Sequence, residues 1–177
     1  MSIAIYIALV VLTIFSAINF VMTLALSRRI RVISAGAAAV SSPMLSPGEA
    51  APAFVAERLN GEIVTLDTYR GKSVGLIFIS PSCKPCTDAM PVYQEASADA
   101  HNKGIELVLV SVGSHSDTRE YVAKVGITLS VICAPRSSNT FFHDYRVPGT
   151  PSYVLINADG TLDTIGYPMI ENGKLLL

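Results

Sequence analysis

The sequence predicts an α/β sandwich with a central mixed sheet, preceded by one N-terminal transmembrane helix. Three observations predict this architecture: a long uncharged segment at residues 3–26, apolar strand-like runs that alternate with helical segments from residue 52 onward, and two hairpin turns. Strands that alternate with helices and close with a hairpin are typical of an α/β sandwich whose sheet mixes parallel and antiparallel pairs.

The composition excludes several classes of protein. Half of the 177 residues are apolar and only 15% are charged, which is too hydrophobic for a disordered or nucleic-acid-binding chain. The net charge of −1 indicates no strongly charged partner. Two of the three cysteines belong to one motif, so the chain is not a disulfide-stapled scaffold. The length allows one ordinary domain plus an appendage.

The appendage is the N-terminal segment. At about 1.5 Å per residue, the uncharged run Ile3–Leu26 is long enough to cross a hydrocarbon core of roughly 30 Å. A secretory signal is the competing interpretation, but no basic region precedes this run, the run is too long, and three arginines follow it. We expect an uncleaved anchor with its basic flank at residues 1–31, a tether at 32–47 and a folded domain at 48–177.

The strands of the domain are predicted from apolar runs and turn signals. Asn60-Gly61 is a strong two-residue hairpin signal, and the segment from Asn157 to Gly160 marks a second hairpin turn. The predicted strands are 54–56, 63–66, 74–79, 105–112, 129–133, 153–156 and 161–166.

The helices are predicted from the segments between these strands. Ser116 or Asp117 is the expected N-cap of the second helix, because either side chain can accept a hydrogen bond from a free backbone N–H group. The predicted helices are 87–103, 117–125, 139–145 and a short final one at 170–177.

Cys83-Lys84-Pro85-Cys86 lies between the buried strand at 74–79 and the helix at 87–103. Two thiols at this spacing can close a small disulfide ring and reopen it. The helix N-terminus favours the thiolate of Cys83, because unpaired N–H groups and the helix dipole stabilise negative charge there. A lone C-x-x-C supplies only half a zinc site, and no second pair or paired histidines occur. The motif therefore predicts dithiol–disulfide exchange with no metal and no cofactor.

Several motifs in order carry a family resemblance. They are G-E-A-A-P-A-F at 48–54, R-G-K at 70–72, the cysteine pair followed by Pro91, Y-R-V-P-G-T-P at 145–151, and Asp159-Gly160. Together they resemble the thioredoxin-like superfamily, in its membrane-anchored TlpA/ResA-like redoxin branch. F-I-S-P-S-C at 78–83 and A-L-S-R-R-I at 25–30 are similar to the MauD-type maturation proteins of methylamine dehydrogenase.

The resemblance implies a thioredoxin-like three-layer sandwich and a thiol–disulfide oxidoreductase. Such an enzyme reduces or isomerises disulfides in extracytoplasmic client proteins, during maturation of a redox enzyme or a cytochrome. In the MauD-like version the client is the disulfide-rich small subunit of methylamine dehydrogenase. The implied partners are a disulfide-containing client, a membrane-embedded or periplasmic electron donor, and the membrane itself through residues 3–26, with no nucleic acid.

The resemblance also implies a location in the bacterial inner membrane, with a single pass and the domain in the periplasm. Arg28, Arg29 and Arg31 predict the opposite orientation, because positive-inside reasoning places the domain that follows them in the cytoplasm. The two expectations conflict, and the sequence leaves the direction of exchange open as well.

The cysteine motif suggests separate roles for its four residues. Cys83 is the predicted nucleophile, with a pKa below the free value of about 8.5. Cys86, one helical turn on and more buried, is the predicted resolving thiol. Lys84 either favours the thiolate through its ammonium charge or is a solvated surface lysine. Pro85 fixes φ in the first helical turn, where its absent N–H is not needed.

Thr150 and Pro151 form the second part of the predicted site. By resemblance, the bond before Pro151 is cis and turns the Thr150 backbone towards the two sulfurs. There the backbone would pair with an extended substrate strand. The competing interpretation is an ordinary turn proline.

Three positions depart from the family pattern. A buried acid is replaced by Ile77, a glutamate by Ala89, and the tryptophan before the first cysteine by Ser82. Asp88 is adjacent to Ala89, but one helical step rotates a side chain by about 100°, so it faces elsewhere. Proton transfer at Cys86 therefore has no assigned group.

The remaining cysteine and the histidines are predicted to be structural or exposed. Cys133 ends a short apolar strand and is expected to be a small core residue. His101, His115 and His143 have no partnering motif and are expected at the surface.

Two other functions compete with disulfide exchange. A peroxiredoxin-like peroxidase would carry P-x-x-x-[ST]-x-x-C; Ser80 fits this pattern for Cys83, but Leu76 occupies the proline position. A copper-binding assembly factor of this fold would resemble C-x-x-x-C with a distant histidine, whereas the spacing here is C-x-x-C.

Overall fold

The computed structural model describes residues 3, 6–7, 9–10, 12–17, 19–20, 45–171 and 173–176. The chain forms two units, Met1–Ser42 and Pro43–Leu177. In the first unit, every described residue is helical and exposed. The predicted span at 3–26 lies only in part within the described residues, and most of the predicted tether lies outside them. No helix in the described part of the chain is long and apolar enough to cross a membrane.

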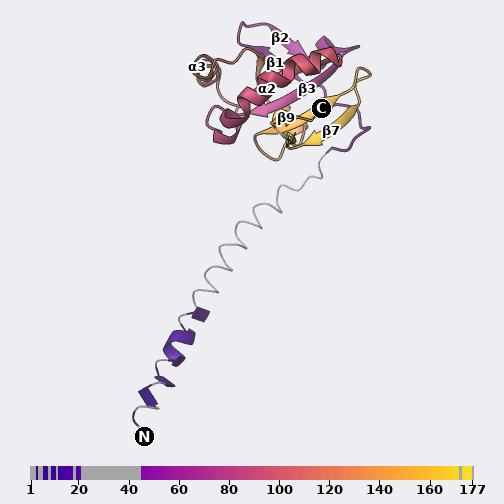
Figure 1. Cartoon of the computed structure of the whole chain (residues 1–177). Coiled ribbons are helices and arrows are strands. Elements are labelled where there is room, and N and C mark those ends of the chain that lie inside the picture. The colour runs from indigo at the N-terminus through magenta and orange to yellow at the C-terminus, as the bar shows by residue number, and fades with distance from the viewer. Residues whose placement is uncertain are drawn as a thin grey trace. The chain divides into compact units, whose positions relative to one another are not determined.

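The second unit is built on a seven-stranded mixed sheet in the order β2-β1-β5-β4-β3-β6-β7 (Figure 1). The central strand β3 runs parallel to β4 and antiparallel to β6. Both predicted hairpins are present, as the antiparallel pairs β1–β2 and β6–β7. The strands are β1 (Val55–Arg58), β2 (Ile63–Thr65), β3 (Ser73–Ile79), β4 (Ile105–Ser111), β5 (Ser130–Cys133), β6 (Ser152–Ile156) and β7 (Leu162–Gly166).

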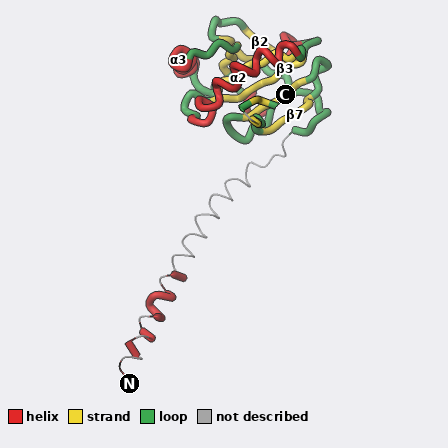
Figure 2. The backbone as a smooth tube through the Cα atoms, viewed as in Figure 1, coloured by secondary structure: helices red, strands yellow, loops and turns green. Residues whose placement is uncertain are grey.

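Helices lie on both faces of the sheet, which confirms the predicted three-layer sandwich. Figure 2 shows α2 and α3. Successive β3 side chains enter opposite faces, as a pleated strand requires: Phe78 packs with the aromatic rings of α4, and Ile77 packs under α2. We call the second group, which includes Ile77, Cys86, Met90 and Tyr121, the α2-side cluster. The helices are the 3₁₀ helix η1 (Leu66–Tyr69), α2 (Lys84–Asn102), α3 (His115–Val125) and α4 (Phe141–Asp144).

Two helices begin earlier than predicted, because their caps lie earlier in the chain. Helix α2 begins directly after Cys83, whose sulfur accepts a hydrogen bond from the Cys86 N–H at 3.2 Å. Helix α3 is capped by Ser114, whose Oγ accepts the Asp117 N–H at 3.1 Å. The predicted caps Ser116 and Asp117 were therefore wrong, because the Ser114 hydroxyl already satisfies a free N–H of the first turn.

The predicted final helix at 170–177 is also wrong. The chain instead forms a two-stranded hairpin from β8 (Ile170–Glu171) and β9 (Lys174–Leu175). Gly173, with φ at 74°, adopts the left-handed conformation that a tight turn needs. Leu175 then buries its side chain in the α2-side cluster. At the other end of this unit, Leu45 already packs in the core, before the predicted start at residue 48.

Candidate active site

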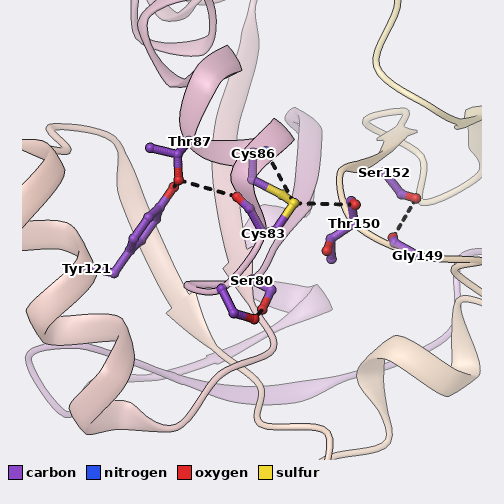
Figure 3. Close-up of a disulfide and its surroundings, with 9 residues drawn as sticks. Ser80, Cys83, Cys86, Thr87, Tyr121, Gly149, Thr150 and Ser152 are labelled. Carbon is purple, nitrogen blue, oxygen red and sulfur yellow. Dashed lines mark hydrogen bonds between the residues drawn. A yellow bond between two sulfur atoms is a disulfide. The ribbon is translucent and has the colours of Figure 1, made fainter.

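The cysteine motif joins the end of β3 to the start of α2. Cys83 and Cys86 form a disulfide, with their Cα atoms 5.3 Å apart (Figure 3). Cys83 is partly exposed, whereas Cys86 is completely buried in the α2-side cluster. A client sulfur can therefore approach Cys83 but not Cys86, which is the order of exposure that the sequence predicts.

Two backbone groups act on the Cys83 sulfur in opposite directions. The Cys86 N–H, at 3.2 Å, favours a negatively charged sulfur, and the helix dipole adds to this effect. The Thr150 carbonyl oxygen lies 3.4 Å from the same sulfur (Figure 3). After reduction, this oxygen can accept a hydrogen bond from the S–H group and so favours the neutral thiol. The reactivity of Cys83 is thus set by a balance between two fixed dipoles.

The loop that carries Thr150 is held by two further hydrogen bonds. The Thr150–Pro151 bond is cis, which confirms the prediction for Pro151. The Ser152 hydroxyl donates to the Gly149 carbonyl at 2.8 Å (Figure 3). At the start of the loop, the Tyr145 hydroxyl donates to the Pro52 carbonyl at 2.8 Å. These bonds keep the Thr150 backbone beside the disulfide.

Lys84 and Pro85 lie on the exposed side of the first turn of α2. The Lys84 ammonium makes two bonds to the Asp88 carboxylate, at 2.9 and 2.8 Å. Since Asp88 partly neutralises this charge and water surrounds both groups, the geometry favours the surface interpretation of Lys84. Its tuning role stays a prediction, as does that of Pro85.

The surroundings of Cys86 are apolar. Ile77, at the position of the family's buried acid, is fully buried in the same cluster, and Ala89 packs against its edge. In the described part of the chain, no acidic side chain is hydrogen-bonded to Cys86. The thiol that must lose a proton during resolution therefore lies in a nonpolar environment.

Two residues near the motif, Thr87 and Tyr121, were not predicted from the sequence. The Thr87 hydroxyl lies 3.3 Å from the Cys83 carbonyl oxygen and 3.1 Å from the Tyr121 hydroxyl (Figure 3). Thr87 immediately follows the cysteine motif, and this position is the only indication in the sequence that it belongs to the site. Nothing in the sequence indicates that Tyr121, on another helix, reaches it.

Cys133 is a buried free cysteine, as predicted. Its burial raises the pKa of the thiol, an effect that a hydrogen bond with Thr118 opposes. Desolvation dominates, so the thiol is neutral and poorly reactive near neutral pH.

The histidines occupy different environments. His101 and His143 are exposed, as predicted. His115 is partly covered but also lies at the surface, with its side chain 39% exposed and 3.6 Å from the Glu57 carboxylate. No group of three histidine, cysteine or acidic side chains within the described residues could hold a metal ion.

A thioredoxin-like fold with a Cys-x-x-Cys pair at the start of a helix defines a thiol–disulfide oxidoreductase. The family model described as "AhpC/TSA family" matches residues 47–165, and the chain belongs to this family. The chain is 30% identical, over 119 residues, to the thiol-disulfide oxidoreductase ResA of Geobacillus thermodenitrificans. That match covers 67% of each protein.

Solved structures of thiol–disulfide oxidoreductases have the same fold. A thiol:disulfide interchange protein DsbE from Chlorobium tepidum superposes with a TM-score of 0.62 at 27% identity, covering 69% of this chain and 85% of the other. The thioredoxin domain of a thiol-disulfide oxidoreductase from Bacteroides vulgatus gives a TM-score of 0.62 at 21% identity, with coverage of 68% and 88%. The second likeness concerns the fold alone. The protein is therefore a thiol–disulfide oxidoreductase of the ResA/DsbE type.

Proposed function

We propose that the protein is a membrane-anchored reductase or isomerase of disulfides in extracytoplasmic client proteins, with Cys83 as nucleophile and Cys86 as resolving thiol. One observation carries this proposal: the sulfur of the partly exposed Cys83 lies between the Cys86 N–H and the Thr150 carbonyl, at the start of α2. A client strand that pairs with the Thr150 backbone would bring its own disulfide beside Cys83.

The reductive exchange runs in two steps. The Cys83 thiolate attacks one client sulfur; the client S–S bond breaks, a mixed disulfide forms, and the second client sulfur leaves as a thiolate. Cys86 then gives up its proton, to that thiolate or to water, and attacks Cys83. The Cys83–Cys86 disulfide forms and the first client sulfur is released. The client gains two electrons, the protein loses two, and a dithiol electron donor in the membrane or periplasm restores the reduced pair.

The proposed client class rests on two short sequence motifs. F-I-S-P-S-C at 78–83 and A-L-S-R-R-I at 25–30 are similar to MauD-type maturation proteins. We therefore propose a client that is a redox enzyme under maturation, such as the small subunit of methylamine dehydrogenase, or a cytochrome. Relatives named ResA and DsbE support exchange with client disulfides in general.

Trapping tests the proposed roles of the two cysteines. Reduced Cys86→Ser protein mixed with a disulfide client should accumulate a mixed disulfide through Cys83, visible as a reductant-sensitive band on a gel. Reduced Cys83→Ser protein should give no such band, because Cys86 is fully buried. If no adduct forms with Cys86→Ser and the wild type does not reduce insulin, the proposal fails.

The wild-type protein and the two cysteine variants also test the two alternative functions, a peroxidase and a copper-binding assembly factor. A peroxidase would consume peroxide faster than it reduces insulin. This alternative is tested because the chain belongs to the AhpC/TSA family. Against it, Leu76 is buried within β3 where the motif needs proline, and the Ser80 hydroxyl bonds to Ser82. A copper-binding factor would retain stoichiometric Cu(I) after dialysis. Either result would contradict a primary role in disulfide exchange.

The proposed anchor is supported by the uncharged run at 3–26 and by the exposure of its large apolar side chains, such as Ile3 and Phe20. We propose a single pass in the bacterial inner membrane, with the domain in the periplasm. A C-terminal alkaline phosphatase fusion should then be active, and a matching fluorescent-protein fusion dark. The reverse pattern would place the domain in the cytoplasm, as Arg28, Arg29 and Arg31 predict.

A further inference from the structure

We propose that Tyr121 and Thr87 are positioning residues that act together on Cys83 from outside the cysteine motif. Thr87 belongs to the first turns of α2, and Tyr121 to the neighbouring helix α3. Neither residue contacts a client sulfur in this proposal. The inference rests on the proposed role of Cys83 as nucleophile.

The direction of the hydrogen bonds in this pair is fixed by chemistry. The Cys83 carbonyl oxygen can only accept, so the Thr87 hydroxyl, 3.3 Å away, donates to it. The Thr87 hydroxyl has only one proton, and the bond to Cys83 uses it. The Tyr121 hydroxyl, 3.1 Å from Thr87 Oγ1, must therefore be the donor in the second bond, and Thr87 Oγ1 the acceptor. The Tyr121 hydroxyl therefore donates to the Thr87 hydroxyl, which in turn donates to the Cys83 carbonyl; Figure 3 draws these three residues.

This polarity has an electrostatic consequence for the reduced protein. Hydrogen bonds in a chain polarise one another, and their effect is stronger in a buried setting. In this proposal, the two O–H groups that donate in series to the Cys83 carbonyl favour negative charge on the sulfur of the same residue. They add to the Cys86 N–H and oppose the Thr150 carbonyl, which favours the thiol.

The pair also holds the Cys83 backbone. The Cys83 carbonyl accepts the Thr87 N–H at 3.2 Å as well as the Thr87 hydroxyl. Opening the disulfide removes the covalent constraint between the two cysteines. With two hydrogen bonds still holding the Cys83 peptide, the sulfur keeps its place beside the Cys86 N–H.

Helix α3 is itself fixed, so the Tyr121 hydroxyl has a defined position. Thr118, one turn before Tyr121, lies on the same helix face, and its hydroxyl bonds to that of Ser111 at 2.7 Å. Thr118 and Ser111 are both fully buried, and Tyr121 is 6% exposed. The buried hydrogen bond between Thr118 and Ser111, at the end of β4, thus fixes helix α3, which carries Tyr121.

The test measures the alkylation rate of Cys83 in the reduced full-length protein as a function of pH, by mass analysis of the cysteine peptides. In Tyr121→Phe and in Thr87→Val, the midpoint of the pH–rate profile should rise by about half a unit. Alkylation of Cys83 at neutral pH should accordingly fall about threefold. Thr87→Ser, which keeps the hydroxyl, should restore the wild-type profile.

Tyr153→Phe is the matched control. Tyr153 is a buried tyrosine of the same cluster, and its hydroxyl has no hydrogen-bond partner among the described residues, so the midpoint should not move. Unchanged midpoints in Tyr121→Phe and Thr87→Val would overturn the inference, even if their melting temperatures fall, because the residues would then only support the fold. A wild-type Cys83 that reacts no faster than Cys133 would overturn both the inference and the proposed function.

Discussion

Replacing Cys83 by serine is expected to abolish disulfide reduction, with a loss of more than about a thousandfold in the initial rate. A serine hydroxyl is not ionised near neutral pH and cannot form the mixed disulfide. The other thiols cannot substitute, because Cys86 and Cys133 are both buried. The measurement is the rate of insulin reduction by the reduced protein, followed as the precipitation of the insulin B chain.

Cys133→Ala provides the control for this experiment. The raised pKa of the buried Cys133 thiol keeps it neutral, so its removal should leave the rate close to that of the wild type. Circular dichroism would show that both variants are folded. A Cys83→Ser protein that keeps a substantial part of the wild-type rate would refute the assignment of Cys83 as nucleophile.

Phe141→Ala is expected to lower the free energy of unfolding by about 3–5 kcal/mol. Phe141 is 1% exposed and stacks on Phe54 at a centroid distance of 4.0 Å. Its ring also forms T-shaped pairs with the rings of Phe78 and Tyr145, at centroid distances of 5.4 and 4.9 Å. Truncation leaves a cavity among these rings. Because domains are stable by only about 5–15 kcal/mol, urea denaturation with the disulfide intact should show a clearly lower midpoint.

Phe142→Ala is the matched control for this variant. Phe142 is the next residue but is only partly buried, and the Arg136 guanidinium lies over its ring, 3.5 Å from the centroid. We expect a loss of about 1–2 kcal/mol, because less apolar area leaves water on folding. Equal losses in the two variants would contradict the view that the aromatic group around Phe141 is the centre of this face of the core.

The location of Phe141 links this core to the active site. Helix α4 leads directly into the loop that ends at Thr150 and Pro151, and Tyr145 at its end is tied to Pro52. Loosening of the aromatic group should therefore also displace the Thr150 carbonyl from the Cys83 sulfur. Activity should fall in Phe141→Ala more than in Phe142→Ala, although neither residue contacts the sulfurs.

Much of the fold was predictable from local signals. The apolar run of β3 and the hairpin of β6 and β7 are confirmed, because each depends on residues close in sequence. The hairpin at Asn60-Gly61 is also present, but its loop comprises residues 59–61, one more than the predicted two. The cis bond at Pro151 was predicted only by resemblance, since nothing in its residues alone distinguishes it from a turn proline. Helix starts were predicted less well, because a cap such as Ser114 depends on backbone geometry.

The sequence alone determined that a dithiol lies between a buried strand and a helix, because the spacing of Cys83 and Cys86 and the polarity around them are local properties. Only the tertiary structure decided what surrounds that dithiol. It joins Tyr121 to Thr87 and folds the C-terminal segment as a hairpin over α2. It also gives the 3.4 Å contact between the Thr150 carbonyl and the Cys83 sulfur, which the family resemblance had implied but the residues alone had not. These contacts join residues far apart in the chain, and packing of the two faces of one sheet creates them.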